Sequence, residues 1–209
     1  MLDLFLPLEC GGCGAPSTRW CAACATALTV HADEPHVILP RIDPGVPVFA
    51  LGRYFGARRN AIVALKEHGR RDLAAPLSCA LELGIGHLLD WGILVAPLSV
   101  VPAPTRRSAA RRRGGDPVTR MAVAAAAPHP FISVAPVLRT AGLVRDSVGL
   151  NSAARERNIT GRVRLSAAPP GEVLLVDDII TTGATAREAV RVLVAGGARV
   201  AAVLALAQV

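Results

Sequence analysis

Apolar and polar positions from Val48 onward change period several times, which predicts strands and helices in alternation. Strands are expected over residues 48–55, 98–102, 131–139, 172–178 and 198–209. Helices are expected over residues 57–68, 72–89, 151–158 and 185–195, with an Ala-rich one ending near Ala127. The strand segments are apolar on both faces. Such strands, separated by helices, are typical of a mostly parallel sheet covered on both sides, so the predicted fold class is α/β.

Composition agrees with this fold class. The chain has 209 residues, 52% of them hydrophobic but only 3% aromatic, so Ala, Val and Leu must build the core. That favours helices packed on an aliphatic sheet over a β-sandwich. The longest apolar stretch, residues 88–101, is interrupted by Asp90, Pro97 and Ser99 and is too short to span a bilayer. We therefore expect no membrane span. A cytoplasmic location is expected because the first residues lack a basic region and a small-residue cleavage site.

The net charge of +7 admits polyanionic partners such as nucleic acid, phosphate ligands or anionic lipid. Six arginines gather in one stretch: Arg106, Arg107, Arg111, Arg112, Arg113 and Arg120. On a helix they would form a basic surface able to meet a pyrophosphate or a DNA backbone, and a merely solvated face is an equally good interpretation. Trp20, Tyr54 and Phe55 are the nearest aromatic residues for base stacking, with packing as the alternative. Lys66 is the only lysine, and it lies near a predicted helix end, where the helix dipole favours any cation.

Four of the five cysteines form two C-x2-C pairs, Cys10 with Cys13 and Cys21 with Cys24. Four thiolates at this spacing predict a structural, tetrahedral Zn²⁺ site, with two redox pairs as the alternative. The segment is too short to bury a core, so the metal would supply its folding free energy. The fifth, Cys79, is expected to be a small buried residue on an apolar helix face. The predicted organisation is a zinc finger over 1–28, a Pro-rich linker over 29–47 and an α/β domain over 48–209.

A chemical motif follows the apolar strand predicted before residue 177. Asp177 and Asp178 stand at its carboxyl end, where α/β folds bind ligands. Thr181, Thr182, Gly183, Ala184 and Thr185 then lead into the next predicted helix. Free N–H groups, hydroxyls and the helix dipole make such a loop an anion site, and Gly183 would let the backbone approach the anion closely. Carboxylates beside a phosphate site suit a ligand with neighbouring hydroxyls. The motif therefore predicts a ribose 5-phosphate ligand.

The segment VLLVDDIITTGAT resembles the PRPP-binding motif of type I phosphoribosyltransferases along its whole length. Five segments follow one another along the chain: the cysteine-rich segment, ALGRYFGARRN, VVPAPTRRSAARRRGG, VGLNSAARERN and this motif. Their order resembles that of the ComF family over nearly all of the chain. The resemblance implies a type I phosphoribosyltransferase-like parallel sheet and a pyrophosphate loop at residues 101–104. Asp177 and Asp178 would hold the ribose hydroxyls of PRPP, and residues 181–185 its 5′-phosphate. Mg²⁺ would bridge ribose and pyrophosphate oxygens.

Members of the ComF family are associated with natural transformation. The resemblance therefore implies a PRPP-binding protein that handles incoming single-stranded DNA, with that DNA and a DNA-uptake helicase as partners. The alternative is a true phosphoribosyltransferase that transfers ribose 5-phosphate to a base or amine and releases pyrophosphate. A third interpretation is an interaction module whose ligand site is vestigial. The chain departs from the family's usual RGFNQ, because Arg113 is followed here by Gly-Gly-Asp-Pro. No catalytic residue is identified.

Overall fold

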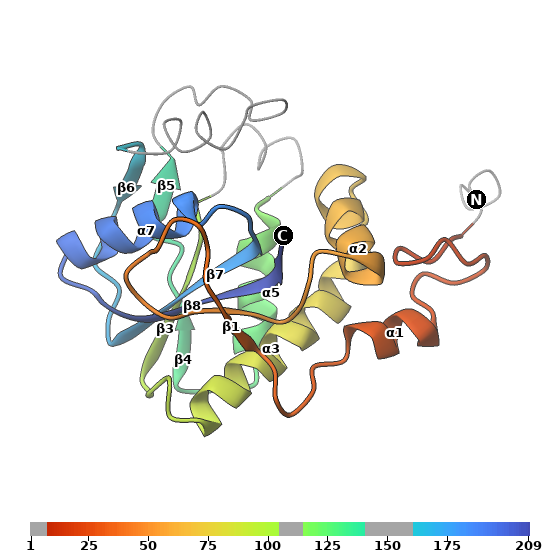
Figure 1. The fold of residues 1–209 in the computed structure, drawn as a ribbon, viewed down its shortest axis with the longest axis horizontal. Helices are drawn as coiled ribbons and strands as arrows, with labels where there is room; N and C mark the ends of the chain where they lie inside the picture. The colour runs from red at the N-terminus through yellow and green to blue at the C-terminus, as the bar shows by residue number, and fades with distance from the viewer. Residues whose placement is uncertain (1–7, 105–114, 141–160) are drawn as a thin grey trace.

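The computed structural model describes residues 8–104, 115–140 and 161–209 of the chain (Figure 1). The α-helices are α1 (Ala22–Leu28), α2 (Gly56–Glu67), α3 (Ala74–Asp90), α5 (Pro117–Ala126) and α7 (Ala184–Ala195), and η1 (Arg71–Leu73) is a 3-10 turn. The strands are β1 (His36–Ile38), β2 (Val48–Ala50), β3 (Leu98–Pro102), β4 (Ile132–Val134), β5 (Leu138–Thr140), β6 (Val163–Leu165), β7 (Glu172–Ile180) and β8 (Arg199–Gln208).

Six strands form the main sheet in the order β1-β2-β8-β7-β3-β4. The pairings β2–β8, β8–β7, β7–β3 and β3–β4 are parallel, and only β1 runs antiparallel to its neighbour β2. The carboxyl ends of the five parallel strands therefore meet at one edge of the sheet. The ends of the central strands β7 and β8 lie side by side at this edge.

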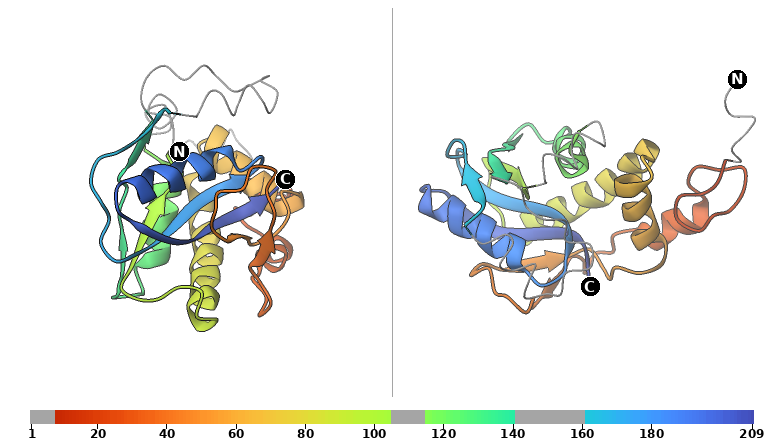
Figure 2. Two further views of the ribbon diagram at one scale, coloured as in Figure 1. Left: turned by 60° about the vertical axis from the view of Figure 1, so that its left-hand side comes forward. Right: turned by 90° about the horizontal axis from the view of Figure 1, so that it is seen from above.

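Helices cover both faces of the main sheet (Figure 2). Successive side chains of β7 point to opposite faces, so Leu174 and Val176 join the core formed with α2, α3 and α5. Val173 and Leu175 join the core formed with α7. These observations confirm the predicted α/β class and the mostly parallel sheet flanked by helices.

Strong local signals set the helix boundaries. Asp116 accepts hydrogen bonds from the N–H groups of Val118 and Thr119 and is followed by Pro117, so α5 begins with a preferred cap and a proline in its first turn. Gly69, at φ +67°, lies just beyond the end of α2, a position that favours glycine. The predicted helices 57–68, 72–89 and 185–195 correspond to α2, to η1 with α3, and to α7.

Several predictions are wrong in detail. Residues 131–139 do not form one strand, because β4 belongs to the main sheet whereas β5 pairs with β6 in a separate two-stranded sheet. The strand predicted over 48–55 ends at Ala50. Residues 36–38, where no strand is predicted, form β1. Cys79 is exposed and not buried. The helix predicted over 151–158 and the arginines at 106–113 lie outside the described residues.

The helical stretch Arg71–Asp90 is long and apolar enough to cross a membrane by length and composition alone. In the structure it is the core helix on one face of the sheet, and 44% of its most apolar window is buried inside the protein. Leu77, Leu81, Ile85 and Leu88 on α3 are fully buried. Its apolar character is therefore accounted for by packing.

Candidate functional site

Asp177 and Asp178 lie near the carboxyl end of β7, at the edge where the parallel strands end. Asp178 is buried, and its Oδ2 atom is 2.5 Å from the Nζ atom of Lys66, which lies one residue before the end of α2. The ion pair thus joins a helix on one face of the sheet to the acidic end of the central strand. Sequence reasoning gave Lys66 no role beyond its place at a helix end. The one feature of the sequence that distinguishes Lys66 is that it is the only lysine in the chain.

The carboxyl group of Asp177 has a pKa raised well above its ordinary value. Burial is the main cause, and the negative charge of Asp178 adds to it, whereas the positive charge of Lys66 opposes both. The Oδ1 atom of Asp177 accepts a hydrogen bond of 2.8 Å from the N–H of Asp178. Among the described residues, the positive charge of Lys66 thus acts on both neighbouring carboxyl groups.

The loop after β7 leads directly into α7. Gly183 is the N-cap of this helix, with φ +87° and no side-chain hydrogen bond to the helix end. The hydroxyl of Thr182 accepts a hydrogen bond from the N–H of Ala184, at a long 3.4 Å. The start of α7 therefore has backbone donors and a helix dipole but no acidic cap, an arrangement that favours an anion.

The segment at residues 40–42 forms a wall of this loop. The N–H of Ile42 donates a hydrogen bond of 2.9 Å to the carbonyl of Thr182. A Cβ atom on Gly183 would overlap the carbonyl oxygen of Ile42 and would lie 2.9 Å from the Cβ of Pro40. The sequence analysis attributes the glycine to close approach of an anion. In the structure its backbone conformation and the contact with residues 40–42 already require it.

The turn at the end of β3 lies beside the Asp177–Asp178 pair. Pro102 is paired with Val176 in the sheet, and the N–H of Ala103 donates to the carbonyl of Val176 at 2.8 Å. Residues 101–104, which the resemblance places at a pyrophosphate loop, are thus close to the two carboxylates. Of the six clustered arginines, only Arg120, on α5, lies within the described residues.

Four cysteines near the N-terminus form a compact cluster. The Sγ atoms of Cys10, Cys13, Cys21 and Cys24 all lie within 4.8 Å of one another. Tetrahedral zinc with Zn–S bonds of about 2.3 Å places its sulfur ligands about 3.8 Å apart. The Sγ atoms of Cys13 and Cys21 are 3.6 Å apart. The N–H of Cys21 contacts the Sγ of Cys10 at 3.3 Å, and the N–H of Cys24 that of Cys21 at 3.5 Å. The cluster could therefore bind a metal ion such as zinc.

The thiols of Cys10 and Cys24 differ in pKa. Burial disfavours the Cys10 thiolate, but hydrogen bonds from the backbone of Cys13, Cys21 and Gly12 outweigh it and lower the pKa of Cys10 to about 6. Burial, followed by hydrogen bonds with the neighbouring thiols, raises the pKa of Cys24. One sulfur atom is thus ready to bind a cation, and a bound cation would favour the thiolate form of the others.

The cysteine cluster is docked on α2, the helix that carries Lys66, and on the residues around η1. The side chain of Asn60 donates a 2.7 Å hydrogen bond to the carbonyl of Gly12. Arg70 donates to the carbonyls of Glu9 and Arg19 at 3.0 and 3.2 Å and is itself held by Asp72. The cluster therefore has a fixed place on the α/β core, and α2 contacts both the cluster and, through Lys66, the Asp177–Asp178 pair.

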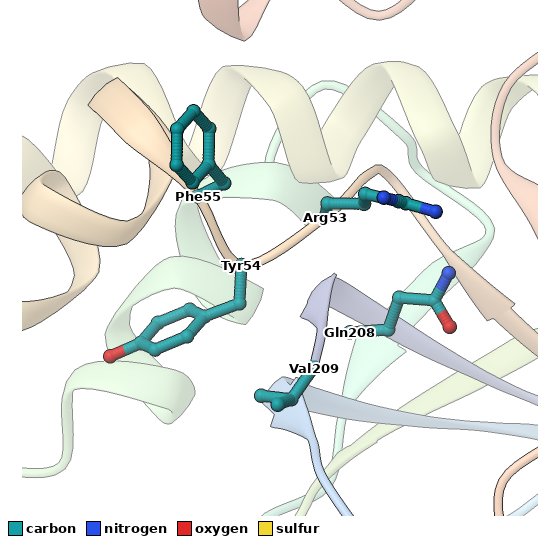
Figure 3. A pocket seen from close by; sticks show the side chains of 5 residues that line it. All are labelled: Arg53, Tyr54, Phe55, Gln208 and Val209. Carbon is teal, nitrogen blue, oxygen red and sulfur yellow. The ribbon is translucent and has the colours of Figure 1, made fainter.

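A groove of about 740 Å³ opens at the same edge of the sheet, where β8 and the segment after β2 come together (Figure 3). It is lined by Arg53, Tyr54, Phe55, Gln208 and Val209. Tyr54 and Phe55 are two of the predicted candidates for base stacking. In the structure Tyr54 is half-buried against the core, whereas the Phe55 side chain is exposed.

Compared with models of known protein families and with curated proteins, the sequence gives no match to either.

Proposed function

We propose that the carboxyl end of β7 and the loop that opens α7 bind the ribose 5-phosphate part of PRPP. One observation carries this proposal. Two adjacent carboxylates lie near the end of a central parallel strand, and a short loop leads from them to a helix whose N-cap is Gly183 and whose first turn holds no acidic residue. The carboxylates would accept hydrogen bonds from the ribose hydroxyls. The N–H groups and hydroxyls of residues 181–185 would hold the 5′-phosphate.

The architecture supports a type I phosphoribosyltransferase-like fold for this domain. The neighbouring strands β3 and β7 are parallel, so the turn after β3 and the loop after β7 face the same space. A pyrophosphate group bound at the turn after β3 and a ribose phosphate bound at the loop after β7 would then belong to one ligand. Mg²⁺, when bound with PRPP, would neutralise charge between its phosphate and ribose oxygens. Asp177 and Asp178 supply carboxylate oxygens, which suit a hard cation.

We propose further that the protein acts as a ComF-like PRPP-binding protein that handles single-stranded DNA. The four-cysteine cluster and the ribose-phosphate motif on one chain support this role, as does the net charge of +7. The alternative is a phosphoribosyltransferase proper. The two carboxylates beside the ribose favour it, because they would stabilise positive charge developing at the anomeric carbon as pyrophosphate leaves.

Calorimetric titration of PRPP with Mg²⁺ tests the proposal. The wild-type protein is expected to bind, and Asp177→Asn/Asp178→Asn to lose roughly tenfold or more in affinity, because hydrogen bonds to charged groups contribute about 1.5–3 kcal/mol each. The control is Asp90→Asn, an exposed carboxylate at the end of α3. It is expected to leave binding unchanged. Equal binding by wild type and double variant, or no binding by either, would overturn the proposal. Release of pyrophosphate from PRPP with a nucleobase would favour the enzyme.

A further inference from the structure

Lys66 contacts the acidic end of β7 although it belongs to a helix. It lies in the last turn of α2, and its Nζ atom is 2.5 Å from the Oδ2 atom of Asp178. The dipole of α2 favours a cation at this end of the helix, but an exposed side chain would satisfy the dipole equally well. The contact with a buried carboxylate therefore indicates a role at the site.

The ion pair is largely withdrawn from water. The side chain of Asp178 is 8% exposed, and that of Lys66 is 27% exposed. A carboxylate this buried loses most of its hydration, and a cation at contact distance compensates for the loss. Removing the cation alone would leave a buried charge without compensation, whereas removing both charges would not. The Asp178 carboxylate therefore depends on Lys66.

Asp177 places a second carboxyl group directly beside this pair. Its Oδ1 atom accepts a hydrogen bond of 2.8 Å from the N–H of Asp178, which fixes its direction. The positive charge of Lys66 acts on Asp177 as well and opposes the repulsion from Asp178. Two adjacent carboxylates can both offer acceptor oxygens to a sugar only if their mutual repulsion is offset. Lys66 supplies that charge from outside the strand.

The position of Lys66 is set by contacts along α2. Ile62 and Leu65 are buried in the core that α2 shares with α3 and α5. Arg58, which is itself buried, donates a hydrogen bond of 3.2 Å to the carbonyl of Leu206 on β8. Because β8 pairs with β7, α2 is fixed against the strand next to the one that carries Asp178. The ammonium is thus held in place before any ligand arrives.

We propose that Lys66 is a positioning residue of the ribose site. Its ammonium neutralises and fixes the Asp178 carboxylate, which then accepts a hydrogen bond from the 2-hydroxyl of the sugar. The site therefore selects ribose 5-phosphate over 2-deoxyribose 5-phosphate. The inference rests on the proposed function for the place of the sugar. It adds a residue of α2 that acts through Asp178 and a preference between two sugars.

Calorimetric titrations of ribose 5-phosphate and 2-deoxyribose 5-phosphate test this role, because the two ligands differ by one hydroxyl group. The wild-type protein is expected to prefer ribose 5-phosphate roughly tenfold or more, as a hydrogen bond to a charged group is worth that much. Lys66→Met keeps the length of the side chain but removes its charge. It is expected to reduce the preference to about threefold or less and to leave the affinity for the deoxy sugar within about threefold.

Further variants separate positioning from a general effect. Asp178→Asn is expected to lower the preference by itself, and Lys66→Met/Asp178→Asn to lower it no further, because residues that act through one another are not additive. Lys66→Arg keeps the charge and is expected to retain most of the preference. Arg71→Gln is the matched control, because it removes an exposed basic residue just after α2 and should leave the preference unchanged. Urea unfolding shows which variants fold. Lys66→Arg and the double variant still decide if Lys66→Met does not.

The outcomes separate this inference from the proposed function. A Lys66→Met protein with the wild-type preference, or equal wild-type affinity for the two sugars, would overturn the inference and leave the proposed function standing. Equal loss of both sugars in Lys66→Met would do the same, because Lys66 would then act through the fold or the overall charge. So would losses that add in the double variant, or a Lys66→Arg protein with no more preference than Asp178→Asn. A wild-type protein that binds neither sugar phosphate nor PRPP would overturn the proposed function, and the inference with it.

Discussion

At the scale of single residues, the charge arrangement around Asp177 is unfavourable for stability. Its half-buried carboxyl lies next to the buried Asp178, and Lys66 is paired at 2.5 Å with Asp178. A raised carboxyl pKa means that the folded protein holds this proton more tightly than the unfolded chain does. Ionisation of Asp177 therefore lowers the free energy of unfolding as the pH rises from the ordinary value of 3.8 toward the raised pKa.

We predict that Asp177→Asn stabilises the ligand-free protein at pH 7. The variant removes the negative charge next to Asp178 but keeps a side chain of the same shape. Its advantage should shrink as the pH falls to 3, below the ordinary value of 3.8, because the wild-type carboxyl is then mostly protonated in the unfolded state as well as in the folded state. Urea unfolding at the two pH values measures the difference, with Asp90→Asn as the exposed control. A variant less stable than wild type at pH 7 would show that the folded state favours the charged form.

At the scale of elements, the start of α7 is held by residues 40–42 of the predicted linker. Ile42 is buried, donates to the carbonyl of Thr182, and lies against Gly183. The acidic pair, the glycine loop and this segment therefore form one local unit. Its shape depends on close approach of two backbones, which only a glycine permits.

Gly183→Ala tests this contact. Gly183 and Gly197 have nearly the same φ, +87° and +86°, but a Cβ on Gly197 would meet nothing within 4 Å. Both alanine variants carry the cost of a positive φ, and only Gly183→Ala adds a clash with the carbonyl of Ile42. We expect Gly183→Ala to lose about 1–3 kcal/mol more in the free energy of unfolding than Gly197→Ala. Chemical denaturation gives both values, and equal losses would mean that residues 40–42 yield easily.

At the scale of the whole molecule, the four-cysteine cluster projects from one end of the α/β core yet is connected to it (Figure 1). Leu28, the last residue of helix α1, and Val30, just after that helix, are buried in the core shared by α2, α3 and α5. Asn60 and Arg70 bind its backbone carbonyls. The metal would therefore stabilise a structure that is already anchored on the core.

Loss of the metal should act locally. Cys24→Ser removes a buried ligand and is expected to abolish stoichiometric zinc, because the remaining thiolates cannot complete a tetrahedral site. Cys79→Ser, on an exposed cysteine outside the cluster, should keep one zinc per chain. Metal analysis with hydrogen exchange checks this, with faster exchange expected in α1 and little change in β7 and β8. A Cys24→Ser protein that still holds one zinc would exclude the cluster as the site.

The sequence by itself determined the elements whose signals are local. Apolar runs and helical spacing predicted α2, α3, α7, β3, β7 and β8, and the cysteine spacing predicted the cluster. Hydrophobic burial and capping act over a few residues, so they can be recognised without the fold. The order of the Asp177–Asp178 pair and the Thr/Gly loop was equally visible, because both lie within one short segment.

Tertiary structure alone decided which distant segments meet. Lys66 reaches Asp178, residues 40–42 pack on Gly183, and Tyr54 is joined to Gln208, although each pair is far apart in the chain. Residues 131–139 have the pattern of one strand, but they divide between two sheets because β6 supplies a partner that no local pattern reveals. Cys79 likewise lies on an apolar helix whose orientation leaves it exposed. Such contacts depend on how the elements pack, and the local pattern carries no record of that packing.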